Sequence, residues 1–285
     1  MRRHLPPEPI SQAALWSRRL GLFAAVVAAL ALALMRLHVL EPVAALTTLG
    51  AAVAISLGAL LLFVAACVTI WRSGARGLGI ALGGLFFIAA TLAYPSYLAF
   101  EAVKLPKLAD VSTDIADPPD FSRSAAALAA RGGVAHANPP PESRAGQRSA
   151  YPDVEPIVLD IETDEAVPLV LKSAAARGWR LVDQRAPSPR SGEAHLDFLD
   201  TSRIFGFDVD VTVRLRPLPG QTRVDVRSAS RYGRHDFGSN AHRIQAFADE
   251  LQNQLDEREE TPIPPERPPI RPSTVKSSPS TRARR

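Results

Sequence analysis

Cysteine is almost absent from this 285-residue sequence, in which Cys67 is the single one. A lone cysteine excludes a disulfide framework and a thiolate metal site within one chain. The sequence also lacks the glycine-rich phosphate loop, the dinucleotide-binding fingerprint, the nucleophile elbow of hydrolases and the metal-binding helix motif. We therefore expect no cofactor and no metal site, and no motif assigns a reaction.

Charged residues are nearly missing between positions 20 and 100. Those present are Arg36, Glu41, Arg72 and Arg76. The uncharged runs 42–71 and 77–100 each exceed the roughly 20 apolar residues that a helix needs to cross a bilayer. The run 20–35 is shorter but extends to residue 40 if Arg36 reaches toward the headgroups. The sequence predicts three transmembrane helices at about 20–40, 43–71 and 77–100, after a basic, unstructured leader at 1–19.

Basic residues around these segments predict their orientation. Four arginines precede the first segment, at positions 2, 3, 18 and 19, and two lie between the second and third, whereas Arg36 and Glu41 balance in the first loop. By the positive-inside rule the N-terminus is cytoplasmic and everything after residue 100 is periplasmic, in a multi-pass protein of the inner (plasma) membrane. The start of the chain also faintly resembles a cleaved twin-arginine export signal, but two further spans favour an anchor.

The interiors of the predicted spans carry no Asp, Glu, Lys or Arg. Pumps and ion pathways usually need buried ionisable groups. We therefore interpret the three helices as an anchor rather than a transporter.

A net charge of +4 and a pI near 9.6 raise the question of nucleic-acid binding. Residues 151–257 hold 13 Lys/Arg against 18 Asp/Glu, so the basic excess lies in the leader and the tail. Because the folded domain carries no basic excess, we expect no nucleic-acid partner.

Proline marks two segments outside the domain. Residues 101–156 are predicted as a proline-rich linker with one short helix at 122–131, and residues 257–285 as a disordered, basic tail rich in Pro and Ser.

Residues 157–256 have the pattern of a folded α+β domain. Valine and leucine alternate with charged residues over 208–216 and again over 223–230, which predicts a β-hairpin with one buried and one charged face. Strands are predicted at 157–161, 179–186 and 195–201, and helices from an N-cap at Thr163 to Gly178 and over 239–255. The expected fold is an antiparallel sheet covered by two helices.

The candidate ligand site is the stretch 227–243, where a strand leads through a glycine-bounded loop into a helix. Free N–H groups and the positive end of the helix dipole would favour an anion there. The residues expected to bind it are Arg227, Ser228, Ser230, Arg231, Arg234, Asp236, Asn240 and Arg243. A structural interpretation stays open, in which Gly233 and Gly238 supply positive φ, Asp236 or Ser239 caps the helix, and the arginines pair with Asp208, Asp210 and Asp225.

An enzymatic interpretation is the alternative. His235 and Asp236 with Ser228 or Ser230 would form a hydrolase set, and His195 with Asp197 would place two metal ligands on one strand face. A solvated polar face has the same pattern, so we expect catalysis less than binding.

These residues carry a family resemblance. The quoted runs are Val111–Asp114, Asp117–Pro119, Gly206-Phe207, Val224–Ser228, Ser230-Arg231 and the spaced set Gly233, Asp236, Gly238, Asn240 and Arg243-Ile244. From about residue 111 to 255 the chain resembles the domain-of-unknown-function family 1499. It departs at Val209, where paired acids are expected, and at His235, where the family commonly has Ser.

The resemblance implies an envelope or plastid-lumen type of protein with no assigned activity, and it makes the Asp-Pro-Pro piece of the linker part of the domain. The sequence thus predicts an uncharacterised membrane protein whose periplasmic domain is a binding or scaffolding module in the cell envelope. Its expected partners are the bilayer and anionic envelope lipids or glycans, or another membrane protein. The alternatives are a membrane-anchored hydrolase using His235 and Asp236, and an accessory subunit of an envelope or transport complex.

Overall fold

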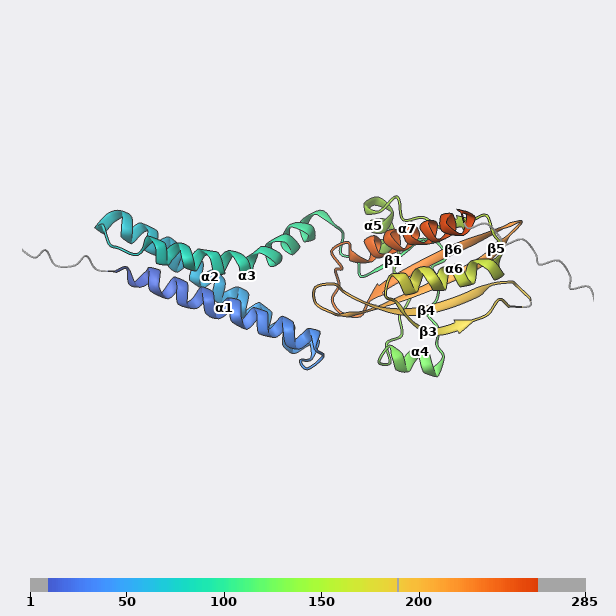
Figure 1. Cartoon of the computed structure of the whole chain (residues 1–285), viewed down its shortest axis with the longest axis horizontal. Coiled ribbons are helices and arrows are strands. Elements are labelled where there is room, and N and C mark those ends of the chain that lie inside the picture. Colours follow the sequence, from blue (N-terminus) through green and yellow to red (C-terminus); the bar gives the residue numbers. More distant parts are fainter. Residues whose placement is uncertain (1–9, 189, 261–285) are drawn as a thin grey trace, which may run out of the picture.

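The computed structural model describes residues 10–188 and 190–260, which form a rod of three long helices followed by an α+β domain (Figure 1). The rod consists of α1 (Gln12–Arg36), α2 (Pro42–Ser73) and α3 (Leu78–Lys104). Each is long and apolar enough to cross a membrane, which confirms the predicted spanning region. The predicted tail at 261–285 and residues 1–9 lie outside the described part.

The first helix begins earlier than predicted. Ser11 accepts a hydrogen bond from the amide of Ala14 and caps α1, so residues 12–19 form its first two turns rather than an unstructured leader. At the other helix ends, Pro42 begins α2 and Gly74 ends it with a φ of 68°.

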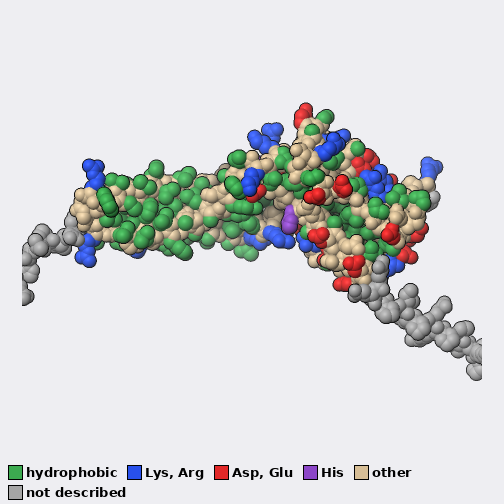
Figure 2. Space-filling view, turned by 90° about the horizontal axis from the view of Figure 1, so that it is seen from above, with side chains coloured by type: hydrophobic (Ala, Val, Ile, Leu, Met, Phe, Trp, Pro, Cys, Tyr) green, Lys and Arg blue, Asp and Glu red, His purple; other side chains and the backbone are tan. Residues whose placement is uncertain are grey.

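Small residues let α1 and α3 cross closely. A Cβ built on Gly84 would lie 2.9 Å from the backbone nitrogen of Arg18, and one on Gly21 would lie 3.1 Å from the carbonyl oxygen of Gly84. Large apolar side chains of the three helices instead face outward, and Figure 2 shows them as a green rod with basic side chains near both ends. An apolar exterior of this extent suits lipid rather than water.

The domain is built on one antiparallel sheet. Its strands are β1 (Asp110–Ser112), β2 (Ile157–Leu159), β3 (Arg180–Arg185), β4 (Ala194–Thr201), β5 (Asp208–Leu218) and β6 (Gln221–Ser230). The strand order is β1-β6-β5-β4-β3, and β2 pairs with the other end of the same edge of β6. The β5–β6 pair is the predicted hairpin, and its turn at 219–220 lies at the end of the domain remote from the rod (Figure 1).

Two helices cover one face of the sheet, as predicted: α6 (Thr163–Ala176) and α7 (Ser239–Glu260). The alternating Val209, Val211, Val213 and Leu215 point into the core between them and the sheet. Trp179 stacks on Phe247 at 4.8 Å between ring centroids. The N-cap of α6 is Glu162 rather than the predicted Thr163, which is the first residue of the helix and whose hydroxyl is hydrogen-bonded to Thr222.

The predicted linker differs most from the structure. Within 101–156, α3 continues to Lys104, β1 joins the sheet, and two helices form, α4 (Ala125–Ala130) and α5 (Pro141–Ala150). Gln147 of α5 is hydrogen-bonded to both the amide and the carbonyl of Ser112 and so holds β1 in place. Most of this segment therefore belongs to the domain.

Loops 202–207 and 231–238 lie at the end of the domain that faces the rod. The rings of Tyr94 in α3 and Phe205 are 5.5 Å apart, and Phe205 stacks on Phe207, which in turn contacts Tyr232. The aromatic contacts join the two parts of the molecule where the apolar helices end.

Candidate functional site

The sheet face opposite α6 and α7 carries buried charges. Residues 113–140, which we call the strap, lie over this face and supply charged and carbonyl partners to it. The charged or ionisable residues buried on the face are His195, Asp197, Asp210, Arg214, Asp225 and Arg227, together with Arg131 of the strap. A buried charge is tolerated only when it is paired and hydrogen-bonded, so the partners of each decide whether the face can also hold a ligand.

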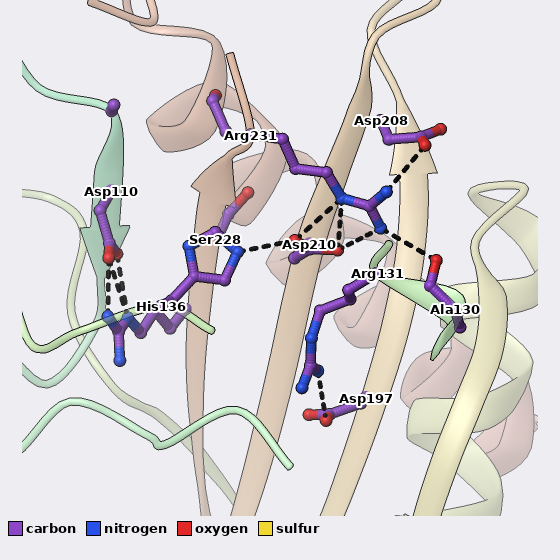
Figure 3. Close-up of polar contacts among 12 residues, drawn as sticks. Asp110, Ala130, Arg131, His136, Asp197, Asp208, Asp210, Ser228 and Arg231 are labelled. Atoms are coloured by element: carbon purple, nitrogen blue, oxygen red, sulfur yellow. Dashed lines mark hydrogen bonds and ion pairs between the residues drawn. The ribbon is translucent and has the colours of Figure 1, made fainter. Parts of the chain in front are cut away.

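Arg231 lies between two carboxylates (Figure 3). Its guanidinium donates to Asp210 at 2.8 Å and to Asp208 at 2.9 Å, and His136 of the strap contacts the second oxygen of Asp210 at 2.6 Å. Burial alone would lower the pKa of Arg231, but the hydrogen bonds and charge of Asp210 outweigh it and raise that pKa. The guanidinium is therefore held in its charged form by partners within the domain.

Arg227 is fully buried and makes the densest set of contacts on this face. It donates to Asp110 of β1 at 2.7 Å, to the strap carbonyls of Pro119 and Ala137 at 3.0 and 2.7 Å, and to Asn138. Its guanidinium also lies 5.0 Å from the ring centroid of Phe121. Arg227 thus fastens β1 and the strap to β6.

Asp197 and His195 do not form an open metal pair. Asp197 accepts from the amide of Ser122 at 2.7 Å and from Arg131 at 3.0 Å, while His195 contacts Thr212 at 2.9 Å and Asp197 at 3.3 Å. Burial would raise the pKa of Asp197, but hydrogen bonds from His195 and Thr212 and the charge of His195 hold it below its usual value. No group of three or more potential metal ligands occurs among residues 10–188 and 190–260.

A third cluster surrounds Asp225, which is fully buried. Arg214, Arg216 and Arg223 reach it at 3.1, 2.6 and 2.8 Å, and all three also pair with Asp114 of the strap. Burial would raise the pKa of Asp114, but the amide of Asp117 and the guanidinium groups of Arg216 and Arg223 lower it.

The predicted loop 231–240 is closed by its own side chains. The Asp236 carboxylate accepts from the amides of Gly238 and Asn240, both at 3.0 Å, and so caps the start of α7. Burial raises the pKa of Asp236 despite these two amides. Gly233 and Gly238 have φ of 85° and 80°, as the structural interpretation requires.

The other predicted site residues form one network behind this loop. Asn240 accepts from Ser228 at 2.9 Å and donates to Ser230 at 3.0 Å, and Arg243 donates to Asn240 at 2.9 Å and to Asp200 at 2.5 Å. His235 stacks on Phe237 and accepts from its amide. Neither Ser228 nor Ser230 contacts His235, so the hydrolase set is not assembled.

Arg234 differs from the other predicted arginines. It is exposed and makes no ion pair within the described ranges, whereas Arg227, Arg231 and Arg243 each pair with an aspartate. The structure divides the remaining predicted residues into two groups. Arg227 and Arg231 lie on the sheet face under the strap, whereas Ser228, Ser230, Asn240 and Arg243 form the network at the start of α7, and the residues of each group are paired with partners of the domain.

A cavity of about 330 Å³ next to this loop was not predicted from the sequence. It is lined from the rod by Met35, His38, Val39, Leu40, Glu41 and Pro42, and from the domain by Gly206, Phe207, Asp208 and Tyr232. The two sets are more than 160 positions apart in the chain, so no spacing could reveal it. The only local signal is the presence of Phe205, Phe207 and Tyr232 in short glycine-containing loops.

Apolar helices joined to a sheet domain with a covered charged face define a membrane protein with one soluble α+β domain. Residues 110–251 match the family described as "Protein of unknown function (DUF1499)". The chain belongs to this family, which confirms the resemblance seen in the sequence. A search of curated proteins finds no match to the chain.

Proposed function

We propose that the protein is a membrane-anchored binding and scaffolding module of the cell envelope, with its N-terminus in the cytoplasm and its DUF1499 domain in the periplasm. The arrangement of the rod supports this orientation. Arg72 and Arg76 flank the α2–α3 connection at the end remote from the domain, whereas Arg36 and Glu41 balance at the near end. The positive-inside rule compares the short connections between spans, and it places the more basic α2–α3 connection in the cytoplasm.

The ligand we propose is anionic, most simply the negatively charged headgroups of the membrane itself. One observation carries this proposal: exposed basic side chains without any ion pair in the described ranges occur in the segments that meet at the rod–domain junction. These residues, which we call the basic collar, are Arg36, Lys104, Lys107, Arg203 and Arg234. Figure 2 likewise has basic side chains around this junction.

Each collar residue near an anionic surface contributes about 1 kcal/mol of attraction, which falls off over a Debye length of ~8 Å at physiological salt. The buried arginines of the predicted site cannot contribute in the same way, because a ligand would first have to displace their aspartates. Among the residues of the predicted site, Arg234 is therefore the one that we propose to contact the anionic headgroups.

Reporter fusions test the orientation. A reporter active only outside the cytoplasm and one that fluoresces only inside it would each be fused after Leu255 in the full chain. Activity outside supports the proposed topology, and fluorescence inside overturns it.

Hydrogen exchange tests the collar. The full chain would be placed in nanodiscs with or without anionic phospholipid, and exchange would be followed in loops 202–207 and 231–238. We expect slower exchange in the anionic discs, and we expect Arg203→Ala with Arg234→Ala to remove this difference. Arg185→Ala with Arg190→Ala is the matched control, since both are exposed and lie beside the β3–β4 connection away from the rod. Equal effects of the two pairs would contradict the proposal.

A further inference from the structure

The cavity between the rod and the domain, which we call the junction cavity, is lined by side chains of a different type from those of the basic collar. Its lining combines an apolar part, Met35, Val39, Leu40 and Pro42, with His38, with the carboxylates of Glu41 and Asp208, and with the rings of Phe207 and Tyr232. Its volume of about 330 Å³ is at the lower end of the range for small-molecule sites. The cavity is therefore large enough for a small polar group, and its lining includes two carboxylates and one histidine.

The two carboxylates retain free acceptor oxygens. Glu41 precedes α2 without a side-chain cap hydrogen bond, and it makes no ion pair with any residue in the described ranges. Asp208 uses its Oδ2 for Arg231 at 2.9 Å, and its Oδ1 has no hydrogen bond or ion pair within those ranges. Free carboxylate oxygens favour a ligand with several N–H donors and a positive charge.

The aromatic rings favour the same charge. Phe207 and Tyr232 lie 5.5 Å apart between ring centroids, and both line the cavity. A cation over the face of Tyr or Phe is attracted by the ring quadrupole. Rings and carboxylates together recognise an ammonium group rather than a phosphate.

The position of the cavity identifies the source of such a group. The cavity lies between the α1–α2 connection and the domain, at the end of the apolar surface of the rod, where lipid headgroups begin. Arg36 borders it, since a Cβ built on Gly206 would lie 3.3 Å from the Arg36 Cδ. A guanidinium beside an anionic cavity matches a zwitterion whose phosphate and ammonium are a few bonds apart.

We propose that this cavity binds the headgroup of one aminophospholipid, with its primary ammonium between Glu41, Asp208 and the rings of Phe207 and Tyr232, and its phosphate toward Arg36. This inference goes beyond the proposed function: the collar responds to negative charge in general, whereas the cavity selects one headgroup. Because the lining comes from both the rod and the domain, a bound lipid fixes the domain against the membrane helices.

Native mass spectrometry of the full chain in a lipid-depleted detergent tests the proposal. Phosphatidylethanolamine, phosphatidylcholine and phosphatidylglycerol would be added separately, and the fraction of chains with one retained lipid would be measured. We expect phosphatidylethanolamine to bind about tenfold more tightly than either other lipid, because choline offers no N–H donor and glycerol no charge. Equal retention of all three lipids overturns the proposal, and preferential retention of phosphatidylglycerol overturns it while supporting the collar.

Variants separate the cavity from the rest of the surface. Glu41→Gln should weaken phosphatidylethanolamine binding about tenfold without changing the binding of phosphatidylglycerol, and Val39→Trp should block the cavity sterically. Glu142→Gln is the control, since Glu142 is exposed on α5 and does not line the cavity. Unchanged binding in both cavity variants, with unchanged thermal unfolding, overturns the proposal.

Discussion

Replacing Arg227 by Ala should destabilise the domain more than any other single arginine change on the charged face. The wild-type side chain is 0% exposed and is the only ion-pair partner of Asp110 in the described part of the chain. Its removal leaves the Asp110 carboxylate, 21% exposed, without a counter-charge, and leaves the carbonyls of Pro119 and Ala137 without their donor.

The magnitude follows from these losses. Removing one partner of a buried pair costs about 3–5 kcal/mol, and each buried acceptor left unpaired adds roughly 1–3 kcal/mol. Because Asp110 is partly hydrated and water can reach some of the vacated space, we expect a loss of about 4–6 kcal/mol. A domain of this size is stable by about 5–15 kcal/mol, so the variant should be close to unfolding. Arg227→Lys keeps the charge without the planar fork and should recover about half of the loss.

The assay is urea denaturation of the full chain in mild detergent, followed by tryptophan fluorescence. Replacing Trp16 and Trp71 of the helices by Phe leaves the buried Trp179 as the sole reporter of the domain core. Arg223→Ala is the matched control, since Asp225 keeps Arg214 and Arg216 as partners and Arg223 is 31% exposed. That change should cost about 1 kcal/mol or less. The reasoning is refuted if Arg227→Ala costs no more than this control.

Three further predictions concern other parts of the molecule. Gly84→Leu should separate α1 from α3 and lower the thermal stability of the purified full chain, because even a Cβ at this position would lie 2.9 Å from the backbone nitrogen of Arg18. Gly79→Leu on the same helix is the control and should have no effect, because a Cβ there has no neighbour within 4 Å. Asp197 has a lowered folded-state pKa, so its contribution to stability is present above the ordinary carboxyl pKa near 4 and is lost as the pH falls through the lowered value. The destabilisation by Asp197→Asn should therefore be large at neutral pH and smaller at about pH 3. An equal difference in denaturation midpoints between wild type and variant at the two pH values would contradict this. Gly238→Ala should lower the unfolding midpoint, because the φ of 80° disfavours any L side chain and the new Cβ would lie 3.1 Å from Leu105. Gly132→Ala is the control and should lower the midpoint less, because its φ is 64° and a Cβ there has no neighbour within 4 Å.

The parts of the fold that were predictable depend on signals within a few residues. Period-two alternation over 208–216 places Val209, Val211 and Val213 on one face, and these residues are buried in the core. Runs without charge likewise identify α2 and α3, because length and apolarity alone decide whether a helix can cross a bilayer.

The strap was not predictable in this way. Its residues have no periodicity, and they are held by partners far away in the chain, such as Arg227, which lies 108 positions after Pro119. The candidate site was predicted only as far as its residue types. The sequence left open whether its arginines pair with Asp208, Asp210 and Asp225, because a single sequence cannot distinguish arginines paired with aspartates from arginines open to a ligand. The junction cavity depends on the placement of the domain against the rod, for which the sequence contains no local signal.

The strap also constrains the order in which the chain can fold. Pro119 of the strap leaves the ribosome 108 residues before Arg227, so the strap is synthesised long before the strands that hold it. Contacts of such separation form late, because the loop between them must close first. If the domain is periplasmic, β6 must cross the membrane before the strap can close over the sheet. The strap is therefore the last layer to be completed, and a chain truncated before residue 227 would lack the guanidinium that binds Asp110 and the strap carbonyls of Pro119 and Ala137.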